Sequence, residues 1–124
     1  LEVELVAAQA SPQLQTCEEH LQEMESAAKN CISRDFFYAD LKFHRALWAA
    51  SQNDCVESTL ERIVPRLFAF AIIQHSNPDK SQLIETSDLH RRLLDAIATG
   101  NVNLGRKLTE LSTERAWLDD AKLP

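Results

Sequence analysis

The chain has 124 residues and is 44% hydrophobic, which suits one domain with one apolar core. Its formal net charge of −6 is unfavourable for binding the phosphate backbone of a nucleic acid. No apolar run approaches the ~18–20 residues that a membrane span requires. With 2 glycines and 4 prolines, the composition argues against a strand-rich fold with many tight turns and favours helices.

Apolar periodicity and capping residues predict three helices in the first part of the chain. Ser11 followed by Pro12 is typical of an N-cap with proline in the first turn, so a helix should begin there. Ser33 is predicted to cap the next one. The three helices cover residues 1–9, 12–28 and 34–50.

Three more helices follow through short connections. Pro65 lies inside the first of them and should kink it, Gly100 is a suitable residue to end the second, and Asn101 should cap the third. These helices cover residues 55–74, 81–99 and 102–120. Helices joined in this way predict an all-α fold, an antiparallel bundle of about six helices.

The helix over 34–50 places polar residues on its apolar stripe. Asp40 falls four residues after Phe36 and three before Phe43, and His44 lies one turn after Asp40. A carboxylate directed at a core is costly unless it is paired or bound to a metal. An Asp and a His at this spacing form either a two-point metal chelate or a simple ion pair on a partly wet face, and the spacing alone favours the ion pair.

The helix over 81–99 repeats this pattern. His90 lies in the middle of an apolar stripe with alternating spacings of four and three residues. The stripe consists of Leu83, Ser87, His90, Leu94 and Ile97. A single core histidine is usually satisfied by a carbonyl or a carboxylate. Three polar groups aimed into one small core, however, favour a shared site formed by Asp40, His44 and His90.

Other polar residues are weaker candidates for lining a pocket. Arg66 follows the Pro65 kink, and an inward tilt would let its guanidinium hold a ligand carboxylate; a side chain that reaches solvent is the alternative. His75 ends its helix and is a second candidate. Ser112 borders the stripe of the last helix. That stripe is predicted to consist of Leu104, Leu108, Leu111 and Leu118.

The cysteines Cys17, Cys31 and Cys55 include no pair at CxxC spacing, so we interpret them as reduced thiols in a cytoplasmic protein. A redox sensor is the alternative, but nothing nearby in sequence is arranged to lower a thiol pKa. No secretory signal pattern is present at the start. The first residue is Leu1 rather than Met, which indicates a piece of a longer protein.

Two motifs together resemble a known family. The first is DLKFHRAL at residues 40–47 with AASQN at residues 49–53, and the second is LHRRLLDAI at residues 89–97 with Gly100 and Asn101. The chain thereby resembles the FCD domain, the C-terminal effector domain of the FadR subfamily of GntR regulators. The resemblance covers essentially the whole chain and implies one ligand-binding domain over residues 1–124.

The resemblance also implies a metal site and partners. Metal-binding members of the family use one Asp and three His, and Asp40, His44 and His90 match three of these positions. The fourth position is Ser112, whose neutral hydroxyl is a poor ligand, so a divalent Zn or Ni ion would bind weakly. The effector expected is a small organic acid, held also by Arg66, Ser112 or His75, and the expected assembly is a homodimer. DNA would be bound only through an N-terminal winged helix-turn-helix, which is absent here.

Two other functions stay open. A metal-dependent hydrolase or isomerase could use Asp40, His44 and His90, although no further general base accompanies them in the sequence. A helical interaction module with a vestigial site would bind neither metal nor ligand. The leading hypothesis is effector sensing rather than catalysis, because it agrees with the resemblance as well as with the residues.

Overall fold

The fold is a bundle of helices, and the described part of the chain contains no strand. The computed structural model describes the backbone of residues 13–74 and 79–121, with the side chains of all of these except 68, 70–74 and 112–121. The helices are α2 (Gln13–Lys29), α3 (Ser33–Ala50), α4 (Asp54–Gln74), α5 (Lys80–Ala98) and α6 (Val102–Ala121). The all-α prediction is confirmed. The helix predicted over residues 1–9 lies outside the described residues.

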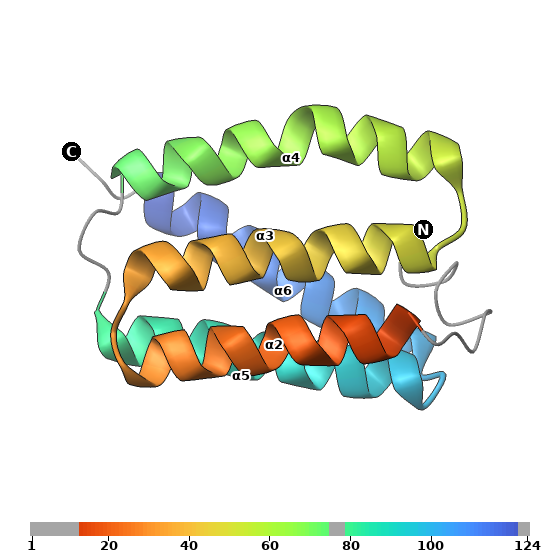
Figure 1. Ribbon diagram of the computed structural model, residues 1–124, viewed down its shortest axis with the longest axis horizontal. Coiled ribbons are helices and arrows are strands. Elements are labelled where there is room, and N and C mark those ends of the chain that lie inside the picture. Colours follow the sequence, from red (N-terminus) through yellow and green to blue (C-terminus); the bar gives the residue numbers. More distant parts are fainter. Residues whose placement is uncertain (1–12, 75–78, 122–124) are drawn as a thin grey trace.

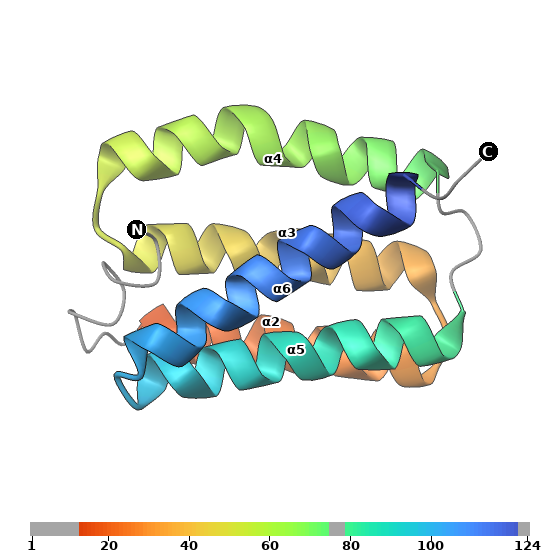
Figure 2. The same cartoon turned by 180° about the vertical axis from the view of Figure 1, so that it is seen from behind.

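The helices α2, α3 and α5 form the centre of the bundle. The helix α2 packs against both α3 and α5, while α4 packs along α3 and α6 packs along α5. Figure 1 shows α4 at one edge of the bundle, and Figure 2 shows α6 crossing the opposite side diagonally toward the end of α4. This arrangement places the inner faces of α3 and α5 together around the core.

The core follows the predicted stripes on α3 and α5. Phe36, Phe43 and Leu47 are buried on α3, and Leu83, Leu94 and Ile97 are buried on α5. On α2 the buried residues Cys17, Leu21, Met24 and Ala28 recur at spacings of three and four, as one face of a helix requires. Asp40 and His90 are buried with these apolar side chains.

The predicted stripe on α6 needs correction. Leu108 is buried, but Leu104 and Leu111 are 38% and 49% exposed, and the side chain of Leu118 is not described. Gly105 is buried together with Leu108. Because glycine has no side chain to hold two helices apart, α6 turns the face that contains Gly105 toward the bundle rather than the face that contains Leu104 and Leu111.

Two helix starts also differ from the prediction. Ser33 is the first residue of α3 rather than its cap, and Ile32 occupies the N-cap position without a side-chain hydrogen bond. The helix α5 begins at Lys80, one residue before the predicted start, with a capping box. In this box the Asp79 carboxylate accepts from the backbone N–H of Ser81, and the Gln82 side chain accepts from the backbone N–H of Asp79. Pro65 lies inside α4, which continues through it.

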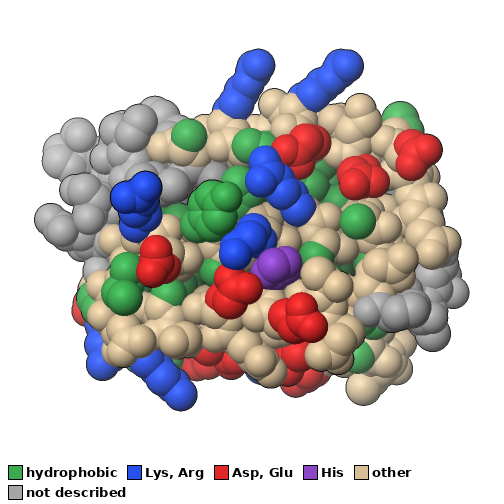
Figure 3. Space-filling model, in the orientation of Figure 1, with side chains coloured by type: hydrophobic (Ala, Val, Ile, Leu, Met, Phe, Trp, Pro, Cys, Tyr) green, Lys and Arg blue, Asp and Glu red, His purple; other side chains and the backbone are tan. Residues whose placement is uncertain are grey.

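Ion pairs join neighbouring helices on the surface. Arg91 on α5 binds Glu18 and Glu25 on α2, Lys42 on α3 binds Glu23 on α2 at 2.7 Å, and Arg45 on α3 binds Glu61 on α4 at 2.7 Å. Basic and acidic side chains therefore alternate on the face drawn in Figure 3. Among the described helices, each one is too short or too polar to traverse a lipid bilayer.

The ends of three helices adopt a left-handed backbone, and these positions provide a stability test. Cys31 and Gln52 have φ values of 54°, and Gly100 has 74°. Only glycine adopts this conformation without steric penalty. We therefore expect Cys31→Gly and Gln52→Gly each to raise the free energy of unfolding by about 0.5–1 kcal/mol, measured by chemical denaturation.

The matched controls should lower the free energy of unfolding. Gly100→Ala should lower it by about 1 kcal/mol through backbone strain alone, because a Cβ at this position would meet nothing within 4 Å. Ala49→Gly, at an exposed position within α3, should lose a similar amount of about 1 kcal/mol through helix propensity. If Cys31→Gly destabilised the protein as much as Ala49→Gly does, the left-handed backbone at Cys31 would carry no steric penalty and the explanation would be wrong.

Candidate functional site

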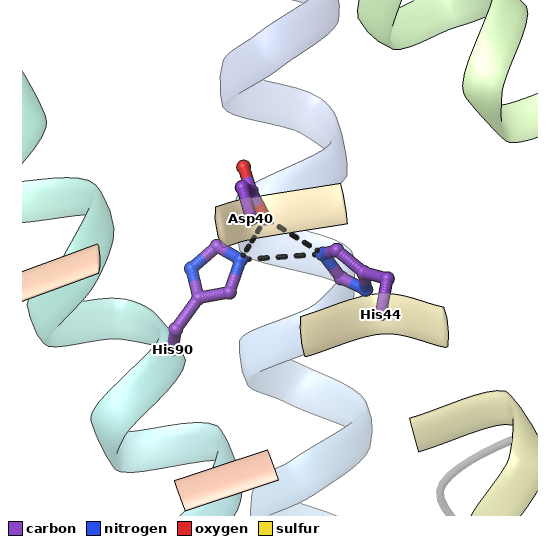
Figure 4. Close-up of side chains that lie close together, drawn as sticks. All are labelled: Asp40, His44 and His90. Carbon is purple, nitrogen blue, oxygen red and sulfur yellow. Dashed lines mark hydrogen bonds and ion pairs between the residues drawn. The ribbon is translucent and has the colours of Figure 1, made fainter. Parts of the chain in front are cut away.

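Three polar side chains converge between α3 and α5. His90 Nε2 lies 2.9 Å from Asp40 Oδ1, His44 Nε2 lies 3.2 Å from the same oxygen, and the two Nε2 atoms lie 3.2 Å apart. Figure 4 shows both imidazoles directed at the carboxylate. The structure thus brings together the three residues that sequence analysis proposed as metal ligands; that they bind a metal stays a prediction.

Helix geometry and core packing position this Asp-His-His triad. Asp40 and His44 are one turn apart on α3, and His90 reaches them from a position 50 residues later on α5. The Phe43 ring packs edge-on against both imidazoles, with ring centroids 5.5 Å from His44 and 5.2 Å from His90. An aromatic wall of this kind restricts the imidazole rotamers and lowers the local dielectric constant, which strengthens every charge interaction within the triad.

The triad is accessible from the side of His44. The side chains of His90 and Asp40 are 8% and 10% exposed, whereas that of His44 is 26% exposed. A ligand or ion arriving from solvent would therefore meet His44 first, while Asp40 and His90 form the inner part of the site.

A backbone carbonyl determines which nitrogen of His90 faces Asp40. His90 Nδ1 lies 2.8 Å from the carbonyl oxygen of Thr86, one turn earlier in α5. A carbonyl can only accept, so Nδ1–H must donate, and Nε2 is the atom left for a ligand. In neutral His90, Nε2 then presents a lone pair to the Asp40 carboxylate. Two acceptors at 2.9 Å repel each other unless a proton or a metal ion lies between them.

Electrostatics favours the charged form of this pair. Burial alone would raise the pKa of Asp40, but the charge of His90 and the hydrogen bonds from His44 and His90 outweigh it and hold that pKa well below its usual range. Burial alone would lower the pKa of His90, but the charge of Asp40 and the hydrogen bonds to Asp40 and Thr86 raise it. The metal-free triad is therefore stabilised by a proton on His90.

The donor set and its spacing also fit a divalent metal. The three ligand atoms, two imidazole nitrogens and one carboxylate oxygen, lie within 4.8 Å of one another. Two ligand atoms that are each bonded at ~2.1 Å to the same ion are separated by roughly 3.0 Å when they are neighbours on an octahedron and by roughly 3.4 Å when they are neighbours on a tetrahedron. The observed separations of 2.9 and 3.2 Å are of this size. Nitrogen and oxygen donors of this kind suit Zn, Ni or Mn.

The other predicted site residues lie apart from the triad or outside the description. Arg66 is exposed on α4, which matches the solvent-directed alternative rather than an inward tilt. His75 lies outside the described residues. Ser112 lies within α6, but its side chain is not described. Their roles in ligand binding stay predictions.

Two features of the site carried little signal in the sequence. Phe43 belonged to the predicted apolar stripe, but nothing showed that it would touch both imidazoles. The Thr86 carbonyl is a backbone group, and only the position of His90 four residues later in a helix could have indicated this bond.

Comparisons with known proteins bear on this site. A family model described as the FCD domain matches residues 1–113, which include all three triad residues. Searches of curated proteins and of solved structures gave no match.

Removing the triad's carboxylate should destabilise the metal-free protein. Asp40→Asn would leave His90 buried without its charged partner, and breaking a buried ion pair from one side lowers the free energy of unfolding by about 3 kcal/mol. Asp95→Asn, at an exposed position on α5, is the matched control and should change it little. Chemical denaturation after chelator treatment measures both. Equal stability of the two variants would show that the Asp40–His90 bond contributes nothing to folding.

Proposed function

The chain belongs to the FCD domain family, which is found in GntR-type regulators, and on this basis we propose that it senses a small organic acid in a central pocket. The observation that carries the proposal is the buried triad of Asp40, His44 and His90. A core of this size gains nothing from three titratable groups unless they are satisfied by one another or by a ligand. Their convergence at a point that is accessible beside His44 favours a ligand.

In this proposal a divalent ion, Zn or Ni, is held by Asp40, His44 and His90. The ion supplies a positive charge and open coordination positions that an acid can fill. The surrounding residues orient the ligands of the ion. The Thr86 carbonyl fixes the tautomer of His90, and Phe43 packs against the imidazole rings of His44 and His90. Ser112 stands where the resemblance to metal-binding members places a third histidine, so metal binding is proposed to be weak and to leave more positions for water or effector.

Effector binding is proposed to act on a larger assembly. In a homodimeric cytoplasmic regulator, an acid that binds one arrangement of the helices more tightly shifts the population toward it and changes the affinity of separate DNA-binding domains. No catalytic role is proposed, because the described part of the site contains no general base besides the triad itself.

Small carboxylates should therefore stabilise the domain. A ligand at 100 times its dissociation constant adds about 2.7 kcal/mol to the free energy of unfolding. A thermal-shift screen of di- and tricarboxylates, sugar acids and keto acids on metal-loaded protein should identify at least one such acid. The same acid should give no shift with His90→Gln. Absence of any shift at millimolar concentrations would count against sensing and would favour the interaction-module alternative.

Supplying the missing imidazole should strengthen metal binding. Ser112→His is expected to tighten Zn or Ni binding by about tenfold, roughly 1.4 kcal/mol. The gain should fade below about pH 6, because imidazole with a reference pKa of ~6.5 must lose its proton to bind a metal. Titration calorimetry on chelator-treated protein measures both affinities.

Two variants control this experiment. Ser112→Ala should leave the weak binding unchanged, and Ser112→His combined with His90→Gln should lose most of the gain. Equal affinities of the parent and Ser112→His would mean that residue 112 does not face the triad. Tight metal binding by the unsubstituted protein would mean that another residue occupies the fourth ligand position of the metal.

A further inference from the structure

The helix α4 carries an apolar row that the described residues leave partly in water. The row consists of Val56, Leu60, Ile63, Val64 and Leu67, at the spacings of one helix face. None of these side chains is buried, and Ile63 and Leu67, one turn apart, are 52% and 45% exposed. An apolar face of a helix normally packs against another element. Among the described helices, α4 packs mainly along α3, so the exposed part of its row has room for a second neighbour.

Two basic side chains border the exposed part of the row. Arg62 and Arg66, also one turn apart, each precede an exposed apolar residue and are exposed themselves. Neither forms an ion pair or a hydrogen bond with any residue of the ranges 13–74 and 79–121. Figure 3 shows Lys and Arg side chains projecting from the edge of the molecule along which α4 runs. This edge therefore favours an occupant with an apolar face and an acidic side chain beside it.

Residues 1–9 have this chemistry. The segment reads LEVELVAAQ and contains two acidic residues and no basic one. In the helix predicted from the sequence, one apolar face consists of Leu1, Leu5 and Ala8. Glu2 lies on one side of this face and Glu4 on the other, so one carboxylate meets the two arginines whichever way the segment runs along α4. A helix this short is not stable alone in water and requires a partner for its apolar face.

The segment is long enough to reach the exposed part of α4. The helices α2 and α4 begin at the same end of the bundle (Figure 1), and α3 lies between them. Two helix spacings and the nine residues from the start of α4 to Ile63 place that residue roughly 22 Å from the start of α2. Residues 9–12 span up to ~13 Å when extended, and a helix over residues 1–8 adds ~12 Å. Their sum of roughly 25 Å covers this distance.

We propose that residues 1–9 bind along α4, where they cover Ile63 and Leu67 and place a carboxylate against Arg62 and Arg66. A second copy of the chain is a poorer occupant, because two half-exposed apolar side chains offer far less than the ~800 Å² per partner of a stable interface. A short tether keeps the segment at a millimolar effective concentration, so that weak contacts are sufficient. The docked segment gives α4 the second neighbour that it lacks among the described residues. Docking does not depend on ligand binding at the triad.

Disulfide cross-linking tests where the segment lies. Cys31→Ser and Cys55→Ser first remove the two exposed native thiols. In this background, Leu5→Cys with Ile63→Cys should form an intramolecular disulfide under mild oxidation, measured by mass spectrometry. The rate should exceed that with Ile84→Cys, at an exposed position of α5, by about tenfold or more, because docking raises the local thiol concentration. Comparable rates with the two partners would overturn the proposal.

Charge reversal tests the recognition in the full chain. Glu2→Lys with Glu4→Lys should lower the urea concentration at the midpoint of unfolding, because attraction to α4 is replaced by repulsion. Arg62→Glu with Arg66→Glu should lower it for the same reason. All four substitutions together should recover at least half of the summed loss, because the attraction returns with reversed signs.

A matched control separates local pairing from net charge. Arg34→Glu with Arg92→Glu changes the net charge by the same amount at exposed positions of α3 and α5. Its midpoint shift should add to that of the reversed segment without recovery. Recovery as large with this control pair as with the α4 pair, or no recovery with the α4 pair, would show that residues 1–9 do not bind along α4.

Discussion

The hydrogen bond between Asp40 and His90 is the constraint on which the arrangement of this bundle depends. The helices α3 and α5 each pack on α2, and this bond joins their buried faces directly at 2.9 Å. A buried carboxylate is tolerated only where a partner meets it with correct geometry. Apolar contacts alone would permit small rotations or shifts of α5, whereas the bond allows one position of His90 relative to Asp40. The apolar stripes supply the attraction between the helices, and the polar pair supplies the register.

The same constraint links folding to ligand chemistry. Asp40, His44 and His90 present several electron pairs to one point, and such a point needs a positive charge. In the metal-free protein a proton between His90 Nε2 and Asp40 Oδ1 would supply that charge; burial lowers the pKa of His90, but the charge of Asp40 outweighs burial and raises it. A divalent metal and this proton would compete for the same Nε2 atom, so metal binding would release the proton. The Thr86 carbonyl suits both states, because it accepts from Nδ1–H in either.

Sequence patterns predicted those features that repeat along a helix. The spacing of Leu83, Ser87, His90, Leu94 and Ile97 gave the buried face of α5 correctly. The leucine spacing predicted the wrong buried face for α6. Gly105 is buried there while Leu104 and Leu111 are exposed, and the spacing of leucines contains no information about how closely a helix can pack at a glycine. Sequence placed Asp40 and His90 on inward faces, but periodicity contains no distances between helices, so their meeting atoms needed the structure.

The helix α3 connects α4 to the triad. Asp40 and His44 face α5, whereas Arg45 on the same helix binds Glu61 of α4. On the far side, α4 packs mainly along α3, and the Arg45–Glu61 pair that joins them is largely exposed. Exposed ion pairs of this kind add only ~0–1 kcal/mol, so α4 is held chiefly by its apolar contacts with one neighbour. By contrast, α2 is packed between two helices and tied by ion pairs to both. Within the described residues, α4 and α6 each pack mainly on one neighbour, so these outer helices can shift with less loss of packing than α2, α3 or α5 can.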